Sequence, residues 1–300
     1  MTKKILITGG SGFIAKSLYE HLSNVYFSPL KNNVIATTRQ QLDLLDSDSV
    51  DTFLEQNKFD VVIHSATYDA VPRFTTKDSG LVLENNLRMF FNILESKKHF
   101  GQLIYFGSGA EAGRDNWIPQ MTEEYIESCI PQDQYGFSKH IMNKIANESE
   151  DVYNLRLFGV FGKFDDWRYR FISNACCKAA LDMPITINKN VRFDYMDIED
   201  LVSVTQRVID SPPSRKSFNV CSGNVYDYKM IAEKIRQISR KKIKIIVKEA
   251  GIKPEYSGTN FKLLDEFKNL TITPLDDSIQ NLYNWYSTNK KIIRKELFEY

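Results

Sequence analysis

The sequence predicts an α/β fold, in which a doubly wound parallel sheet is followed by a smaller C-terminal α/β lobe. Three observations lead to this prediction. Short apolar runs alternate with amphipathic stretches over the first 160 residues, a glycine-rich turn follows the first run, and the alternation loosens afterwards. Strands that alternate with helices imply parallel pairing, and ligands of such sheets bind at the carboxyl ends of the strands.

The first half of the chain contains five expected strands, each a short apolar run of the kind found in buried parallel sheets. They cover residues 5–7, 34–38, 61–63, 103–106 and 154–158. The stretches between them have helical apolar spacing and begin at residues 14, 47, 81 and 135. Ser47 is the expected N-cap of the second helix because it directly precedes the apolar stripe.

The second half predicts helices over residues 167–181, 198–210 and 228–240 and from residue 276 onward. Strands are expected at 185–187 and 243–247, and residues 217–221 are expected to return to the first sheet. We therefore expect a cofactor-binding domain over residues 1–162, with returning segments near 190–222. Residues 163–300 would mainly form a substrate-binding lobe.

Composition excludes several classes of protein. The 39 basic and 38 acidic residues nearly cancel, which argues against a nucleic-acid or anionic-membrane partner. With 42% hydrophobic residues the chain can fill a core, and none of its apolar runs is long enough for a membrane span or a signal peptide. The four cysteines lack the CxxC spacing of a zinc or redox site, so we expect no metal and a reduced, cytoplasmic protein.

A glycine-rich turn joins the first strand to the first helix. Gly9 permits a tight turn, and Gly12 lets the backbone approach a pyrophosphate at the helix N-terminus, where free N–H groups favour negative charge. Because the turn follows a strand and opens a helix, we interpret it as a dinucleotide-binding turn of a Rossmann fold. A plain structural turn is the alternative.

The end of the second strand indicates which dinucleotide binds. NAD-binding sheets usually carry an acidic residue there for the ribose 2′-hydroxyl, whereas arginine suits the 2′-phosphate of NADP. Residues 36–41 contain no acid and include Arg39, which favours NADP(H), with NAD as the alternative. Arg39 could also be an ordinary surface charge.

Three residues combine hydroxyl and ammonium groups near the expected ligand site. Tyr135 and Lys139 are four residues apart, so a helix places them on one face, and a nearby cation would lower the pKa of the phenol. Ser108 follows the fourth strand, where it could bond a substrate carbonyl. The same spacing recurs at Tyr286 and Lys290, which we interpret as ordinary structure; position, and not spacing, favours the first pair.

Taken together, these residues resemble the extended short-chain dehydrogenase/reductase family, in its nucleotide-sugar epimerase, dehydratase and reductase branch. The motifs that carry the resemblance run along nearly the whole chain. They are residues 8–14 (TGGSGFI), 42–46 (LDLLD), 62–66 (VIHSA), Asn85-Asn86, the Ser108–Tyr135–Lys139 set, 155–162 (LRLFGVFG) and 193–200 (FDYMDIED). Residues 38–46 are particularly similar to GDP-fucose-synthase-like enzymes, which are NADP-dependent and act on 4-keto-6-deoxy sugars.

The resemblance implies roles for individual residues. The catalytic set would be Ser108, Tyr135, Lys139 and Asn86. The cofactor would be held by Gly9, Ser11, Gly12, Phe13, Ile14, Arg39, Asp43, Leu44, Ser65, Ala66, Tyr135 and Lys139. A homodimer is also implied, because this family commonly pairs the helices that correspond to residues 81–96 and 135–147.

Departures from the family pattern narrow the expected reaction. The family's dehydratases place an Asp-Glu pair directly after the catalytic hydroxyl, where this chain has Gly109-Ala110 and only then Glu111, so a 4,6-dehydratase is disfavoured. Gly159 replaces an asparagine that touches the sugar nucleotide in relatives. Fucose-synthase-like enzymes epimerise with a cysteine and a histidine; the nearest candidates, Cys129 and His140, are interpreted as structural.

The leading hypothesis is therefore an NADPH-dependent reductase of a nucleotide-activated 4-keto (deoxy)sugar, used in making cell-surface polysaccharide. Four cations of the second lobe are candidates for binding the substrate diphosphate, although each could be surface charge: Lys163, Arg168, Arg170 and Arg192. A C4 epimerase with retained NAD⁺ is the first alternative. A non-catalytic NADP(H)-binding sensor is the second, disfavoured because Tyr135 and Lys139 are both present.

Overall fold

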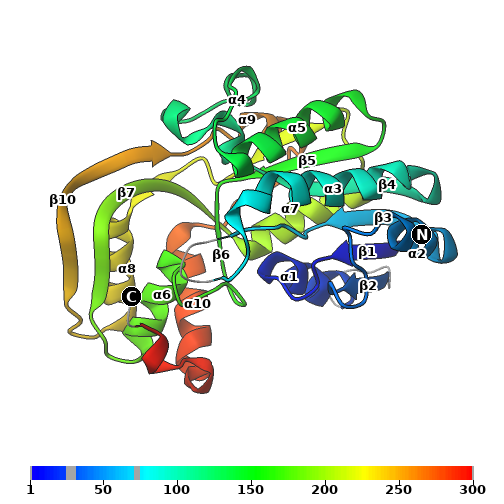
Figure 1. The fold of residues 1–300 in the computed structure, drawn as a ribbon. Helices are drawn as coiled ribbons and strands as arrows, with labels where there is room; N and C mark the ends of the chain where they lie inside the picture. Colours follow the sequence, from blue (N-terminus) through cyan, green and yellow to red (C-terminus); the bar gives the residue numbers. More distant parts are fainter. Residues whose placement is uncertain (1, 25–31, 71–74, 299–300) are drawn as a thin grey trace.

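A computed structural model describes residues 2–24, 32–70 and 75–298, and its centre is a six-stranded parallel sheet (Figure 1). The strands run in the order β2-β1-β3-β4-β5-β8, and every neighbouring pair is parallel. Their bounds are β1 (Lys4–Thr8), β2 (Asn33–Thr37), β3 (Phe59–His64), β4 (Phe100–Ser108), β5 (Val152–Leu157) and β8 (Ser217–Val220). The predicted doubly wound sheet is confirmed, including the return of the chain to it at β8.

Helices cover both faces of this sheet, and the strand sequences explain which side chains they meet. In β1, Ile5 and Ile7 pack with α1 (Phe13–Leu22) and α7 (Ile198–Asp210), whereas Leu6 packs on the opposite side. That opposite face is covered by α2 (Ser47–Asn57), α3 (Val82–Glu95) and α5 (Gln134–Glu148). Alternate residues of a strand point to opposite faces, so a strand buried on both sides is apolar throughout.

The order of the strands places a crevice at the carboxyl ends of β1 and β3. The chain runs outward from β1 to β2 on one side, then crosses back to β3 and continues through β4 and β5 on the other. Ligands of open α/β sheets bind where the strand order reverses in this way. Thr8, His64 and Ser108 end β1, β3 and β4 at this edge.

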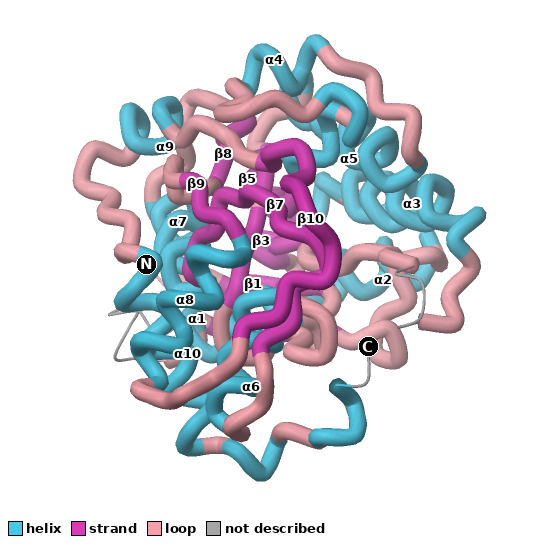
Figure 2. The backbone as a smooth tube through the Cα atoms, turned by 90° about the vertical axis from the view of Figure 1, so that its left-hand side faces the viewer, coloured by secondary structure: helices cyan, strands magenta, loops and turns pink. Residues whose placement is uncertain are grey.

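A second, four-stranded sheet lies beside the first. It contains β6 (Gly159–Phe161), β7 (Ile185–Asp197) and β10 (Ile245–Tyr256), with β9 (Val225–Asp227) antiparallel to β7. In Figure 1, β7 and β10 run side by side along the outer edge of this lobe, and Figure 2 shows them in front of the large sheet. The core of the lobe is formed with α6 (Phe171–Ala180), α8 (Tyr228–Ser239) and α10 (Leu275–Thr288).

Two elements of this lobe differ from the expected bounds. The strand predicted at 185–187 continues to Asp197, because β7 pairs with β10 along its length despite its polar residues 188–190. Conversely, α6 begins at Phe171 and not at residue 167. The Asn174 side chain donates to the carbonyls of Trp167 and Arg168 (2.9 and 3.1 Å), so these carbonyls accept from a side chain and not from the backbone of a helix.

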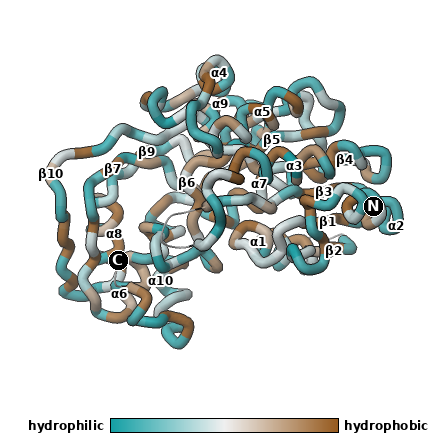
Figure 3. Tube along the Cα trace, in the orientation of Figure 1, coloured by the Kyte–Doolittle hydropathy of each residue, from teal (hydrophilic) through white to brown (hydrophobic). Residues whose placement is uncertain are grey.

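The outer strand β10 mixes hydrophobic and hydrophilic residues along its exposed length, unlike the buried strands of the large sheet (Figure 3). Only its last residue, Tyr256, is buried. Among the residues that the structure describes, no helix has both the length and the apolar character to cross a membrane.

Candidate active site

The glycine turn has the geometry expected of a phosphate-binding turn. Gly9 has φ +71°, and a Cβ built on it would lie 2.8 Å from the Cα of Ala66, so only glycine fits. The Gly12 N–H donates to the Gly9 carbonyl (2.8 Å) and closes the turn. No side chain caps the N-terminus of α1, whereas an aspartate caps each of α2, α5 and α8. The cap of α2 is Asp46, so the prediction of Ser47 as its N-cap is wrong by one residue. The free N–H groups of a helix start suit a pyrophosphate.

In front of this turn lies a cavity of about 260 Å³ that the predicted cofactor residues line. Its lining includes Gly9, Ser11, Gly12, Arg39, Asp43, Leu44, Ser65 and Ala66. Arg39 follows β2, and its side chain is 70% exposed and lies 3.4 Å from the Asp43 carboxylate. A guanidinium held so loosely at the cavity rim is free to bind a phosphate. The residues present therefore fit a nicotinamide dinucleotide.

A second cavity, of about 490 Å³, opens at the carboxyl ends of β3 and β4 beside the start of α5. Ser108, Tyr135 and Lys139 all line it, together with Phe13 and Ile14 of the glycine turn. The Ser108 hydroxyl accepts a hydrogen bond from the Ala110 N–H (3.1 Å). The Lys139 ammonium donates to the Phe106 carbonyl (2.9 Å). It lies 5.9 Å from the centre of the Tyr135 ring.

The charge states of this trio follow from burial. Burial lowers the pKa of Lys139 to about 8, and the nearby Glu111 carboxylate opposes this shift. Burial also raises the pKa of Tyr135 to about 12, with a further rise from Asp69. The predicted net lowering of the Tyr135 pKa is therefore wrong for this structure, because burial dominates. At neutral pH Tyr135 is a protonated phenol, which makes it a proton donor.

Asn86, implied by the resemblance as part of the catalytic set, is buried and fully engaged. Its amide group donates to the Tyr68 and Val82 carbonyls (3.0 and 2.8 Å), and its carbonyl accepts from the Tyr68 N–H (2.8 Å). These bonds hold the loop after β3 against α3. In this structure Asn86 positions the wall of the cavity.

The four candidate cations for a diphosphate separate into two groups. Arg170 lines the catalytic cavity, and Arg168 lines an adjoining cavity of about 690 Å³, where it pairs with Asp166. Lys163 instead pairs with Glu20 (2.8 Å) and Arg192 is exposed, and neither lines either cavity. The geometry thus brings together two of the four. The other candidates for chemistry, Cys129 and His140, also lie outside both linings.

Sequence reasoning missed several residues of the site. Glu111 is buried directly beneath Ser108, where its carboxylate accepts from the serine N–H (3.0 Å) and pairs with Arg156 (2.7 Å). Trp117 and Tyr256 come from distant segments and form a wall of the catalytic cavity. A charged residue just after a buried strand gave a weak signal for Glu111; nothing near Tyr256 in the sequence indicates a site.

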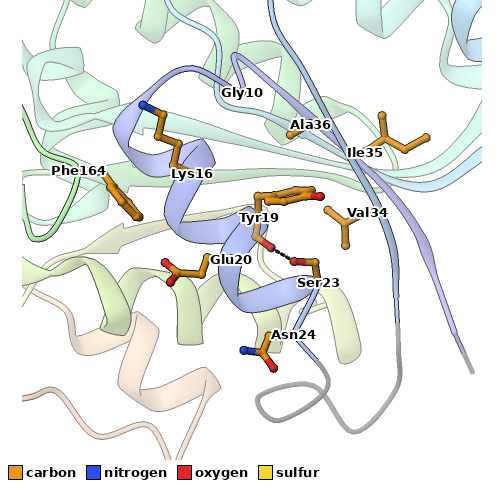
Figure 4. A pocket seen from close by; sticks show the side chains of 10 residues that line it. All are labelled: Gly10, Lys16, Tyr19, Glu20, Ser23, Asn24, Val34, Ile35, Ala36 and Phe164. Atoms are coloured by element: carbon orange, nitrogen blue, oxygen red, sulfur yellow. Dashed lines mark hydrogen bonds between the residues drawn. The ribbon is translucent and has the colours of Figure 1, made fainter.

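A further hollow lies on the outer side of the glycine turn, between α1 and β2. Lys16, Tyr19 and Glu20 of α1 face it together with Phe164, and none of the Ser108–Tyr135–Lys139 set lines it (Figure 4). The dashed line in the figure is the bond from the Ser23 hydroxyl to the Tyr19 carbonyl, which closes the end of α1. This hollow is separate from the site described above.

A switch-point crevice with a glycine turn and a Ser–Tyr–Lys set defines the extended short-chain dehydrogenase/reductase class. The model of the NAD dependent epimerase/dehydratase family matches residues 5–221, so the chain belongs to this family. Members of this family are NAD(P)-dependent nucleotide-sugar enzymes. The resemblance found in the sequence motifs is confirmed.

Individual relatives are distant. The chain is 27% identical to a GDP-6-deoxy-D-talose 4-dehydrogenase of Aggregatibacter actinomycetemcomitans over 284 residues (89% of this chain, 92% of the relative). It is 25% identical to a GDP-6-deoxy-D-mannose reductase of Pseudomonas aeruginosa over 262 residues (82% and 83%). A crystal structure of a GDP-L-fucose synthetase from Naegleria fowleri bound to NADP shares the fold, with TM-score 0.84 and 18% identity over 98% of this chain and 97% of that one.

Proposed function

We propose that this protein is an NADPH-dependent reductase of a nucleotide-activated 4-keto (deoxy)sugar, which supplies a sugar for cell-surface polysaccharide. The observation that carries the proposal is the convergence of Ser108, Tyr135 and Lys139 on one cavity beside the glycine turn. The two relatives named above, a 4-dehydrogenase and a reductase, both act on GDP-6-deoxysugars by their names.

The chemistry follows from the protonation states. When bound, a reduced nicotinamide supplies hydride to the ketone carbon. Ser108 donates a hydrogen bond to the ketone oxygen, and Tyr135 passes its proton to that oxygen as negative charge develops there. Lys139 stays protonated below about pH 8 and stabilises the resulting phenolate. Proton transfer by a positioned side chain typically accelerates such a step by ~10²–10⁴.

Reduction without epimerisation fits this cavity best. No cysteine lines it in the described parts of the chain, and its one histidine, His64, shares a hydrogen bond with Thr8 (3.1 Å). Burial and the Lys139 charge lower the pKa of His64 to about 3, so it remains neutral. Glu111, the nearest carboxylate to the dehydratase position, is occupied by Arg156.

The nucleotide would occupy the adjoining cavity, which belongs mainly to residues 163–300. Arg168, Lys178, Lys189 and Lys253 line it and offer positive charge to a diphosphate. This cavity shares Arg114, Trp117, Tyr169 and Phe193 with the catalytic cavity, so one ligand can span both. We assign the sugar to the catalytic cavity and the nucleotide to its neighbour.

The test is incubation with NADPH or NADH and a panel of 4-keto sugar nucleotides, followed by mass spectrometry. A reductase consumes one NADPH per product, whose mass rises by two hydrogens. A C4 epimerase, the second candidate, interconverts 4-hydroxy sugar nucleotides with no net change in the reduced nicotinamide absorbance. Binding of NADP(H) with neither reaction would instead favour a sensor.

Two companion proposals concern the protein's setting. We propose a cytoplasmic homodimer whose subunits meet through α3 and α5, helices that also pack on each other within one chain. Light scattering measures the mass of the particle in solution. Charge-reversing Arg88, which is exposed on α3 and pairs with Glu84, would then weaken the dimer without altering the active site.

A further inference from the structure

The catalytic cavity contains a second phenol that the Ser–Tyr–Lys set does not include. Tyr256, the last residue of β10, is buried (6% exposed), and its hydroxyl lies 3.4 Å from the Ser108 hydroxyl. Its ring packs against Trp117, Phe158 and Phe193, with ring centres 4.3, 5.1 and 5.2 Å away. The phenol therefore has a fixed place beside the active serine.

The backbone that follows Tyr256 is tied to a separate segment. The Met121 N–H donates to the Ser257 carbonyl (3.0 Å), and the Gln120 N–H donates to the Ser257 hydroxyl (2.8 Å). Within the sheet, Tyr256 pairs with Phe193 of β7. Side chains supported in this way by packing and hydrogen bonds keep the geometry that a site needs.

Tyr256 also fills space that a side chain at position 109 would need. A Cβ built on Gly109 would lie 2.7 Å from the Tyr256 hydroxyl and 2.6 Å from the Phe158 ring. Both distances are too short for a Cβ unless a neighbouring group moves. The Tyr256 phenol can therefore lie where it does because residue 109 is a glycine. The group beside the serine is supplied from 148 positions further along the chain, at residue 256.

The hydrogen-bonding capacity of Ser108 gives this contact a consequence. A serine hydroxyl has two acceptor sites and one proton. The Ala110 N–H occupies one acceptor site (3.1 Å). Either hydroxyl could be the donor of the 3.4 Å contact between Ser108 and Tyr256. Burial raises the pKa of Tyr256, so its phenol is protonated and able to donate to the other acceptor site. When the phenol is the donor, both acceptor sites are filled and the serine proton is left for a group in the cavity.

We propose that Tyr256 is the positioning residue of Ser108: its phenol donates to the serine oxygen and thereby makes Ser108 a one-way donor to the substrate ketone. The inference rests on the proposed reductase function. It explains why the wall of the cavity carries a phenol and not a third phenylalanine beside Phe158 and Phe193. A donor fixed toward a ketone oxygen stabilises the negative charge that develops there during hydride transfer.

Tyr256→Phe removes the hydroxyl and keeps the ring among its aromatic neighbours. We expect kcat to fall roughly 3- to 10-fold, with the substrate KM and the Kd of NADPH unchanged, since one neutral hydrogen bond is lost. Tyr195→Phe is the matched control: its hydroxyl bonds Tyr228 (3.2 Å) in the same aromatic group, but Tyr195 lines neither cavity. The control should retain wild-type kcat.

A double-variant cycle separates positioning from a general structural effect. If Tyr256 acts through Ser108, Tyr256→Phe has no further effect on kcat in a Ser108→Ala background. Multiplicative losses in the double variant, or full kcat in Tyr256→Phe alone, would overturn the proposal.

A crystallographic arm keeps this result distinct from failure of the proposed function. If the wild type reduces no 4-keto sugar nucleotide, the reductase assignment fails, yet structures of wild type and Tyr256→Phe still test the pairing. We expect the variant to show Ser108 in a new rotamer or a water on its freed acceptor site. An unchanged rotamer with no added water contradicts the role assigned to Tyr256.

Discussion

The Arg156 guanidinium lies 2.7 Å from the Glu111 carboxylate, and both side chains are closed off from solvent (0% and 1% exposed). The other oxygen of Glu111 accepts the Ser108 N–H (3.0 Å), so the active serine is anchored to this buried ion pair. Arg156 is fixed in turn by the Asn219 side chain (3.1 Å). Loss of the Arg156 charge would leave Glu111 buried without its partner, and loss of the Glu111 charge would leave Arg156 only its longer contact with Glu127 (3.6 Å).

Glu111→Gln should therefore destabilise the protein by ~3–5 kcal/mol, the usual cost of breaking a buried pair on one side. Urea unfolding followed by circular dichroism measures this loss. The control is Glu233→Gln, which breaks the partly exposed pair with Arg236 on α8 (side chains 34% and 44% exposed) and should cost only about 0.3–0.5 kcal/mol. Equal losses in the two variants would show that the Glu111–Arg156 pair contributes no special stability.

Tyr135→Phe should lower kcat by ~10²–10⁴, because the proton donor to the alkoxide is removed. Binding of NADPH, measured by its fluorescence, should persist, since the ring remains in place. Tyr19→Phe, on the far side of α1, serves as the control. Undiminished turnover in Tyr135→Phe would refute the role of the phenol.

Activity should decline as the pH rises through about 8, the pKa to which burial lowers Lys139. Above this pH the ammonium loses its proton and no longer stabilises a phenolate. The profile of kcat/KM against pH reports this group in the free enzyme. Because Glu111 acts to raise the pKa of Lys139, the decline should move to lower pH in Glu111→Gln. A profile that stays flat to pH 9.5 would contradict the assignment.

Arg39→Ala should weaken NADPH binding about 10-fold or more, as expected for the loss of a charge-assisted bond to phosphate, and leave NADH binding unchanged. Titration of each reduced cofactor, followed by fluorescence, measures both constants. Arg236→Ala, on α8 outside the cofactor cavity, controls for the loss of positive charge. An equal loss for the two cofactors would mean that Arg39 does not read the 2′-phosphate.

The strands of the large sheet were predictable because they are buried on both faces and therefore read as continuous apolar runs. β7 was predicted too short because it pairs with the exposed strand β10. Polar residues are tolerated at 188–190 in such a pair, and they interrupt the apolar pattern from which a strand is predicted. The Ser108–Tyr135–Lys139 set was predictable from its position around the fourth strand. The protonation of Tyr135 was not, since it depends on burial and on Asp69 from another loop.

The wall of the cavity was beyond prediction for a different reason. Tyr256 reaches Ser108 only through the pairing of β10 with β7, a contact between segments about 60 residues apart that no local pattern encodes. Likewise, Lys163 lies in the segment expected to bind the substrate diphosphate, but its ammonium pairs with the Glu20 carboxylate of α1.

The placement of Tyr256 also bears on how such a site can diversify. The family model ends at residue 221, whereas the phenol that sits on the active serine comes from residue 256. The Ser108–Tyr135–Lys139 set and most of the cavity around it thus lie in the stretch that the family model matches, whereas Tyr256 lies outside that stretch. Substitutions in the outer strand can therefore change the partner of Ser108 while the matched stretch stays the same, so the rate of the reaction can evolve through a segment that lies outside the family pattern.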